Sequence, residues 1–284
     1  MSASATSATA ERADLRHLSG SLVLVGAGKM GGALLDGWLR FGVPPTNVTV
    51  VEPHPSAQIA ALGDRGVRLQ SDAGGLADAA AVIIAVKPQI AADVLPAIAP
   101  LIASSTLVVS IMAGRTLHFL AAALPRPCAL VRAMPNTPAA IGRGITVAVA
   151  RGADAAQREL AQRLLAATGA VEWVDDEALM DAVTAVSGSG PAYVFLLAEA
   201  LAQAGVAAGL PPPLAEKLAR ETVAGAGELL HRTSLDAATL RENVTSPGGT
   251  TAAALEVLTG GNALANLLTK AVLAATERSR KLAG

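Results

Sequence analysis

Residues 243–251, which read N-V-T-S-P-G-G-T-T, have the composition of an anion-binding site at the start of a helix. Ser246 is a good N-cap, and Pro247 suits the first helical position, where a missing N–H costs nothing. Two glycines and two threonines follow, so a ligand can approach the backbone and meet hydroxyls beside free N–H groups. An apolar helix is predicted over 252–258. The stretch suits a small carboxylate or a phosphate, and the alternative is an ordinary capped helix start.

A second motif, G-A-G-K-M-G at residues 26–31, follows a predicted strand at 22–25 directly and opens a helix predicted over 30–41. This is the context that a G-x-G-x-x-G dinucleotide site requires. The first glycine makes the tight turn, the second lets a pyrophosphate approach, and the third lets the helix pack on the strand. The helix dipole favours the phosphate charge. The motif predicts a dinucleotide site, against the alternative of a strand–helix turn without a ligand.

Glu52 follows the second predicted strand, 48–51, and lies 26 residues after Gly26. An acid at this place binds the ribose 2′-hydroxyl of a dinucleotide and disfavours a 2′-phosphate, which favours NAD. Lys29 and Arg65 are possible counter-charges for a phosphate. The choice between NADH and NADPH therefore stays open, with a slight preference for NAD.

Two further motifs end predicted strands and lead into turns, A-V-K-P at 85–88 and M-A-G at 112–114. Both lie at the carboxyl edge of the predicted sheet, where ligands bind in doubly wound folds. Lys87 could contact the cofactor or be a solvated loop residue, and small residues at the second turn would let a nicotinamide lie against the backbone. The turn M-P-N-T-P at 134–138 is rigid, and its prolines are expected to shape the loop.

The elements that must position these motifs change in kind along the chain. The first half alternates short hydrophobic strands with alanine-rich helical segments, which indicates a parallel sheet covered on both faces. After about residue 175 no strand is predicted. The predicted strands are 22–25, 48–51, 67–69, 81–86, 107–112, 128–132, 145–150 and 171–174, and the predicted helices of the second half include 177–186, 192–205 and 213–230.

We therefore predict an α/β protein with two domains. A Rossmann-like dinucleotide-binding domain is expected at 21–175 and an all-helical domain at 176–284. Residues 1–20 are rich in Ser, Thr and Ala, include Glu11 and Asp14, and have no apolar core. That composition is typical of a disordered tail and not of a signal or transit peptide.

The bulk composition excludes several classes of function. A formal net charge of −1 and 2% aromatic residues argue against a nucleic-acid partner. Residues 94–114 carry no charge, but Pro96, Pro100 and a Ser-Ser-Thr cluster divide them, so no membrane span is predicted. Because Cys128 is the single cysteine, no internal disulfide can form, which favours a reducing compartment. Its mostly apolar neighbours predict a buried structural thiol. We expect a cytoplasmic protein.

No metal site is expected from the sequence. The four histidines are scattered without ligand spacing, and one cysteine cannot supply a thiolate cluster. A dinucleotide loop, a helical domain and an anion site together predict hydride transfer to a small anionic substrate.

Taken in order, these motifs resemble those of the pyrroline-5-carboxylate reductase family. The resemblance rests on G-A-G-K-M-G, A-V-K-P, S-I-M-A-G, M-P-N-T-P, D-A-V-T-A-V-S-G-S-G-P-A-Y and N-V-T-S-P-G-G-T-T. The last two are highly specific to that family. The resemblance implies a Rossmann-like domain followed by an all-helical dimerisation domain. It also implies NAD(P)H-dependent reduction of the cyclic imine 1-pyrroline-5-carboxylate to L-proline, the final step of proline biosynthesis.

The resemblance also implies roles for individual residues. Asn243 and Glu177 match polar positions that meet cofactor and substrate where two subunits join, which requires a homo-oligomer of at least two chains. Thr251 is the candidate catalytic residue at the imine nitrogen, and because a threonine hydroxyl is a poor acid we assign it an orienting or relaying role. The predicted substrate-binding residues are Glu177, Ser246, Gly248, Gly249, Thr250 and Thr251. The predicted cofactor-binding residues are Val25, Gly26, Ala27, Gly28, Lys29, Met30, Gly31, Glu52, Ala85, Val86, Lys87, Pro88, Ile111, Met112, Ala113 and Asn243.

Two other functions compete with this interpretation. A related two-domain dehydrogenase would act on a 3-hydroxy acid and would need a catalytic lysine in the helical domain. Lys217 lies there, but next to a P-P-P entry and away from any glycine-rich neighbour. A non-catalytic dinucleotide-binding redox sensor would keep the glycine loop and have no reason to maintain the anion site.

Overall fold

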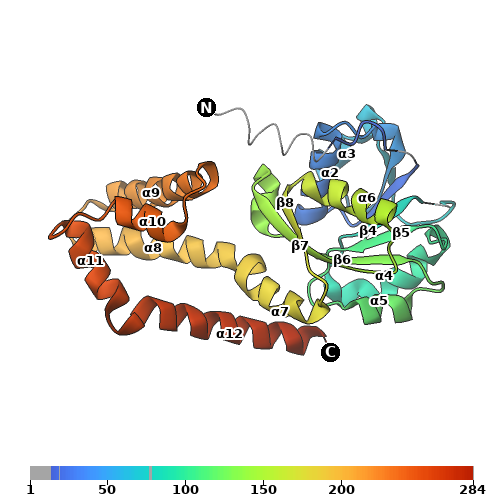
Figure 1. Ribbon diagram of the computed structural model, residues 1–284. Helices are drawn as coiled ribbons and strands as arrows, with labels where there is room; N and C mark the ends of the chain where they lie inside the picture. Colours follow the sequence, from blue (N-terminus) through green and yellow to red (C-terminus); the bar gives the residue numbers. More distant parts are fainter. Residues whose placement is uncertain (1–13, 19, 77–78, 284) are drawn as a thin grey trace. The chain divides into compact units, whose positions relative to one another are not determined.

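The computed structural model describes residues 14–18, 20–76 and 79–283 (Figure 1). The chain forms two compact units. The first comprises the residues up to Gly188 together with those from Thr276 onward, and the second comprises Ser189–Ala275.

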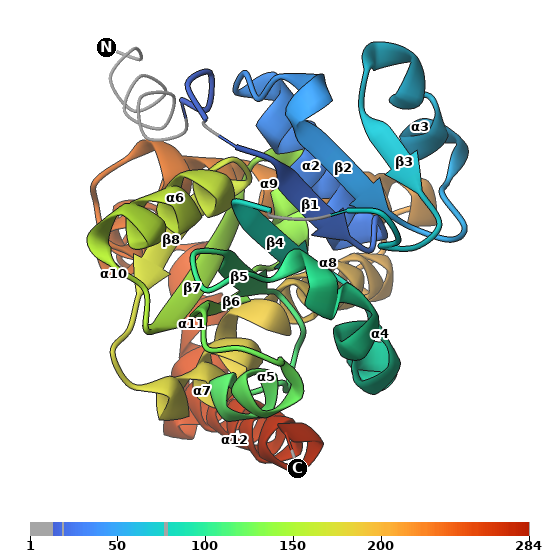
Figure 2. The same ribbon diagram turned by 90° about the vertical axis from the view of Figure 1, so that its right-hand side faces the viewer.

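The first unit is built on an eight-stranded sheet with the order β3-β2-β1-β4-β5-β6-β7-β8, which can be followed in Figure 2. All eight predicted strands are confirmed. The sheet is parallel except for one pair, because β7 runs antiparallel to β6. The strands are β1 Leu22–Val25, β2 Val48–Val51, β3 Arg68–Gln70, β4 Ala81–Ile84, β5 Leu107–Ser110, β6 Ala129–Met134, β7 Gly144–Arg151 and β8 Gly169–Trp173.

Helices cover both faces of this sheet (Figure 1). Alternate residues of β1 point to opposite faces, as the pleat requires. Leu22 and Leu24 pack in one core with α2 and α6, while Val23 and Val25 pack in the other with α4 and α5. Covering on both faces explains why β1 is apolar at every position. The helices of this unit are α2 Lys29–Arg40, α3 Ala57–Ala60, α4 Ala91–Ile98, α5 Leu117–Ala123, α6 Ala155–Ala166 and α7 Met180–Val183.

The second unit is helical. Its helices α8 and α9 pack closely on each other, and a Cβ at Gly205 would lie only 3.2 Å from the Cβ of Ala215. Small residues at such a contact allow two helices to approach. The helices are α8 Gly190–Ala207, α9 Pro212–Arg232, α10 Ala237–Asn243, α11 Thr250–Thr259 and α12 Ala263–Ala283, and the last turns of α12 belong to the first unit.

Two predictions are wrong in detail here: the single helix over 177–186, and the gap at 187–191 that separates it from the predicted helix 192–205. A 3₁₀ turn at Glu177–Leu179 leads into α7, and a π-helical turn at Thr184–Gly188 leads almost directly into α8. Pro191 does not interrupt this run because it lies in the first turn of α8, where its missing N–H has no intrahelical acceptor. The motif S-G-S-G-P is therefore helical and not a loop.

Part of the segment 1–20, predicted to be a disordered tail, packs on the fold. Residues 1–13 and 19 lie outside the described residues, but Leu15 and Leu18 are buried in the core beside α2. The N–H of Leu15 donates to the carbonyl of Phe41 at 3.0 Å. These two buried leucines anchor the segment to the fold. The small and polar residues around them led to the wrong prediction of disorder.

The compact units divide the chain after Gly188 and not at the predicted limit near Asp175. The predicted domains, 21–175 and 176–284, stay a prediction about how function is divided along the chain.

Among the described residues, one helical run, Glu177–Ala207, is long and apolar enough to cross a membrane. Length and composition alone are weak evidence for a span, because buried helices of other proteins pass the same test. Only 6% of its most apolar window is buried within the chain, so most of this surface is exposed in a single chain. The uncharged segment 94–114, in which no membrane span was predicted, is divided between α4, a turn and β5.

Candidate functional site

The glycine loop between β1 and α2 has the shape of a dinucleotide cradle. Gly26 has φ of +89°, and its N–H donates to the carbonyl of Val51 at 2.9 Å. A Cβ at Gly31 would lie 2.2 Å from the carbonyl oxygen of Gly26, whereas a Cβ at Gly28 would meet no atom within 4 Å. The first glycine is thus needed for the turn, the third for close packing, and the second faces open space that a pyrophosphate can fill. These residues fit a dinucleotide.

Glu52 holds the glycine loop to the loop after β2. Its Oε2 accepts the N–H of Ala27 at 3.0 Å, and its Oε1 accepts the N–H of His54 at 3.1 Å. The N–H of Glu52 donates to the carbonyl of Gln70 on β3 at 2.9 Å. The carboxylate is therefore fixed at the carboxyl end of β2, where the ribose of a dinucleotide lies in this fold.

The loops after β4 and β5 lie at the same edge of the sheet. Strand β4 ends at Ile84 and β5 at Ser110, so residues 85–86 and 111–112, predicted as the last residues of these strands, lie in the loops. The side chain of Met112 is buried in the core with α4 and α5, while Ala113 is exposed. Met112, predicted to bind the cofactor, is only 2% exposed as a whole residue. Lys87 is exposed.

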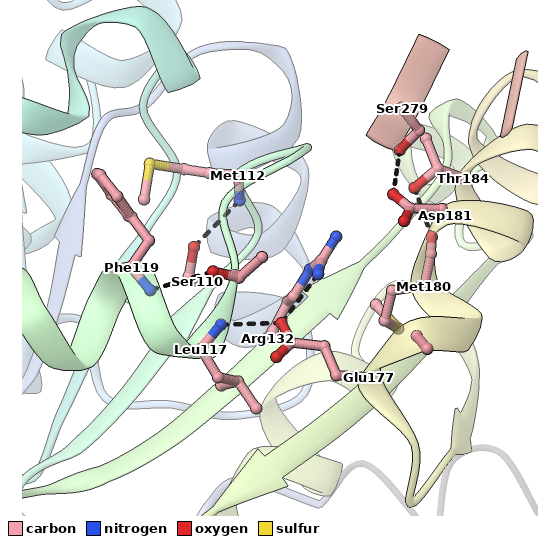
Figure 3. Close-up of polar contacts among 12 residues, drawn as sticks. Ser110, Met112, Leu117, Phe119, Arg132, Glu177, Met180, Asp181, Thr184 and Ser279 are labelled. Carbon is pink, nitrogen blue, oxygen red and sulfur yellow. Dashed lines mark hydrogen bonds and ion pairs between the residues drawn. The ribbon is translucent and has the colours of Figure 1, made fainter. Parts of the chain in front are cut away.

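Glu177, predicted to bind substrate, already has two partners in the first unit (Figure 3). Its Oε1 accepts from Arg132 Nη1 and from the N–H of Leu117, each at 2.8 Å. Arg132 is only 4% exposed and lies on β6, and Leu117 is the first residue of α5. The carboxylate compensates a buried guanidinium and caps a helix start, and removing one member of such a pair typically costs about 3–5 kcal/mol. A substrate role for Glu177 stays a prediction.

Arg132 was missed by the sequence analysis. The available signal was a charged residue inside an otherwise apolar strand, A-L-V-R-A-M. A buried arginine needs a carboxylate partner. The partner lies 45 residues further along the chain, so the sequence offered no local means of finding it.

The other predicted substrate residues, Ser246 and Gly248 to Thr251, lie in the second unit around the start of α11. Ser246 is not the N-cap of that helix. The N–H of Gly249 donates to the carbonyl of Ser246 at 3.0 Å, and Gly248 has φ of +71°. Proline in the second and a positive-φ glycine in the third position of a four-residue turn are typical of a type II turn. The helix therefore begins after this turn, at Thr250, with Gly249 as its N-cap.

This turn presents the two threonines at the first helical positions. Thr250 is exposed and Thr251 half-buried. The first N–H of the helix to find a helical acceptor is that of Ala253, which donates to Gly249 at 3.2 Å. The N–H groups before it have no intrahelical acceptor and can bind an anion together with the hydroxyls. Asn243 is the last residue of α10, one turn before this site.

Cys128 is half-buried, and burial raises the pKa of its thiol. A raised pKa disfavours the reactive thiolate, in agreement with a structural residue. The described part of the chain holds no group of three or more His, Cys, Asp or Glu side chains placed to bind a metal ion.

Two family models match separate parts of the chain. Residues 177–282 match the family model described as pyrroline-5-carboxylate reductase dimerisation, and residues 21–114 match that of NADP oxidoreductase, coenzyme F420-dependent. A pyrroline-5-carboxylate reductase of Pseudomonas aeruginosa is 40% identical over 92% of this chain and 96% of that protein.

Two solved structures are similar over 94% of this chain and 99% of each of theirs. The pyrroline-5-carboxylate reductase from Coxiella burnetii has a TM-score of 0.86 and 34% identity. The pyrroline carboxylate reductase of Plasmodium falciparum, with NADP bound, has a TM-score of 0.79 and 30% identity.

Proposed function

The chain belongs to the pyrroline-5-carboxylate reductase family, and from this membership we propose how its residues divide the work. It is an NAD(P)-dependent oxidoreductase that reduces pyrroline-5-carboxylate, which implies a role in proline biosynthesis. The carboxyl edge of the sheet binds the cofactor, and residues 246–251 bind the substrate. The type II turn before α11 is the observation that carries the second assignment, because it leaves two hydroxyls and free N–H groups at one helix start.

The proposed chemistry needs little more than binding and orientation from the protein. NAD(P)H, when bound, supplies the hydride. The free N–H groups of α11 and the Thr250 hydroxyl hold the carboxylate of 1-pyrroline-5-carboxylate. The oxygen of the Thr251 hydroxyl accepts a hydrogen bond from the protonated ring nitrogen, which fixes the ring and favours its protonated form, the better hydride acceptor.

The assay that tests this function compares substrates. Oxidation of NADH and NADPH is followed with 1-pyrroline-5-carboxylate and with simple keto acids. Reduction of NAD⁺ and NADP⁺ is followed with 3-hydroxy acids. We expect turnover with the imine alone. Oxidation of a 3-hydroxy acid would favour the dehydrogenase, and cofactor binding without any turnover would favour the redox sensor.

We propose that Glu52 makes NADH the preferred cofactor of this chain. Its fixed carboxylate would bind ribose hydroxyls and repel a 2′-phosphate. We expect kcat/KM for NADH to exceed that for NADPH, and Glu52→Gln to shift the ratio toward NADPH by about tenfold, since one charge-assisted hydrogen bond contributes roughly 1.5–3 kcal/mol. Glutamine keeps the shape and one acceptor oxygen.

The matched control for this measurement is Asp64→Asn, which removes an exposed acid in the 3₁₀ turn Gly63–Arg65 of the same unit. It should leave the ratio unchanged. A wild-type preference for NADPH, or an equal shift in both variants, would contradict the role of Glu52.

The protein acts on a small molecule and oligomerises. We propose a homo-oligomer of at least two chains, in which substrate and cofactor meet where two subunits join. The support is the surface of α8, where Phe195, Leu196 and Leu197 are consecutive and 57–67% exposed. Consecutive residues point in directions about 100° apart, so the helix is apolar around much of its circumference, which is typical of a buried helix. A second copy of the chain covers this surface.

We also propose that the protein works in the cytoplasm.

A further inference from the structure

Arg115 connects the two loops that carry predicted nicotinamide contacts. It follows the loop after β5, and its Nε and Nη2 both donate to the carbonyl of Pro88, at 3.1 and 2.8 Å. Pro88 lies in the loop after β4. The guanidinium is held from another direction by the ring of Phe119, one turn into α5, whose centroid lies 4.6 Å from the Arg115 Cζ.

The backbone next to Arg115 has a second contact within the first unit. Gly114 has φ of +73°, and a Cβ there would lie 3.3 Å from the carbonyl oxygen of Leu282, near the end of α12. That end of α12 is tied down by Ser279, whose Oγ donates to Asp181 Oδ1 at 2.6 Å (Figure 3). The loop after β5 is therefore bound to Pro88 through Arg115 and lies close to the end of α12 at Gly114.

We propose that Arg115 is a positioning residue for hydride transfer, which holds the loops at 85–88 and 111–113 in fixed relation to each other. The inference rests on the proposed placing of the cofactor at these loops. The last backbone hydrogen bonds that join these loops to the sheet come at their first residues, where the N–H of Ala85 donates to Val25 at 2.8 Å and that of Ile111 donates to Ile84 at 3.0 Å. The bidentate bond from Arg115 to Pro88 takes the place of the sheet hydrogen bonds that stop there.

The expected consequence is on turnover more than on affinity. The glycine loop and Glu52, which bind the remainder of the dinucleotide, do not contact Arg115. Loosening the two loops lets the nicotinamide move, and a misplacement of about 1 Å can cost up to roughly a hundredfold in rate. We expect Arg115→Ala to lower kcat about tenfold while the Kd of NAD(P)H changes by less than about threefold.

Three variants and one control test the proposal. Arg115→Ala removes the contact, Arg115→Gln keeps the stem but not the fork of two donors, and Arg115→Lys keeps the charge with a single point of donation. Arg126→Ala removes an exposed arginine just beyond α5. The measurements are kcat with the imine, the Kd of NAD(P)H by fluorescence titration, the thermal midpoint, and the kinetic isotope effect with cofactor deuterated at C4.

The expected result is a fall in kcat for Ala and Gln, partial recovery for Lys, a larger isotope effect as hydride transfer becomes limiting, and an unchanged control. Should Arg115→Ala fail to fold, Arg115→Gln carries the same comparison. Turnover equal to that of Arg126→Ala, or a fall in kcat explained by an equal loss of cofactor affinity, overturns the positioning role. An inactive wild type would instead overturn the proposed function, so the two failures are distinguishable.

Discussion

Thr251→Val should reduce the turnover of 1-pyrroline-5-carboxylate by roughly a hundredfold, the lower end of what a positioned proton-transfer group contributes. Valine keeps the branched shape of threonine and loses only the hydroxyl, so the start of α11 should be preserved. The hydroxyl lies at the second position of that helix and is half-buried. Its loss removes the group that we assign to the ring nitrogen, while the carboxylate site at Thr250 and the backbone N–H groups remains.

The measurement is kcat and KM for the imine at saturating NAD(P)H, together with the Kd of the cofactor. The Kd should stay close to that of wild type, and Thr251→Ser should recover much of the turnover because it restores the hydroxyl. Thr259→Val is the matched control, since Thr259 ends the same helix and its Oγ1 bonds only the carbonyl of Leu255. Wild-type turnover in Thr251→Val would remove the hydroxyl from the mechanism.

Gly31→Ala should weaken cofactor binding, with a rise in the Kd of NAD(P)H of at least about tenfold, which corresponds to about 1.4 kcal/mol. The added Cβ would lie 2.2 Å from the carbonyl oxygen of Gly26 and 3.1 Å from the Cβ of Ala85. The first of these is a backbone atom of the cradle itself, so relief requires a shift of the turn that approaches the pyrophosphate. Overpacking of this kind typically costs about 1–3 kcal/mol, so the thermal midpoint should fall as well.

The neighbouring glycine provides a close control. A Cβ at Gly32 would make ordinary contacts at 3.8 Å, with Ala27 O and Ile59 Cδ1. Alanine is favoured over glycine within a helix by about 1 kcal/mol, so Gly32→Ala should bind cofactor normally and be as stable as wild type or more so. Equal cofactor affinity in Gly31→Ala and Gly32→Ala would show that the packing of the third glycine does not shape the cradle.

Much of the fold could be predicted because its signals are local. A strand buried on both faces is almost continuously apolar, as in β1 (L-V-L-V) and β2 (V-T-V-V), so the strands could be found one at a time. The glycine loop could be predicted for the same reason, because each of its three glycines is required by the geometry of the turn or of the first helical residues. The resemblance to a family rested on motifs of the same kind, read in order.

The wrong predictions have a different cause, because they concern features that residue type alone does not determine. The direction of β7 depends on pairing with β6, and apolar composition is the same for parallel and antiparallel strands. Ser246 satisfies the residue preferences of an N-cap, yet the competing type II turn at the next positions moved the helix start to Thr250. The burial of Leu15 depends on a core formed by residues far along the chain.

The sequence by itself determined the class of the fold, the cofactor loop and the family, because these rest on residue types at short spacings. Only the tertiary structure decided what the charged residues near the sheet edge do. Glu177 meets Arg132 across 45 residues, Glu52 meets Ala27 across 25, and Arg115 meets Pro88 across 27. An ion pair or hydrogen bond acts over a few ångströms of space whatever the separation along the chain, so its partners become known only when the sheet brings the loops together.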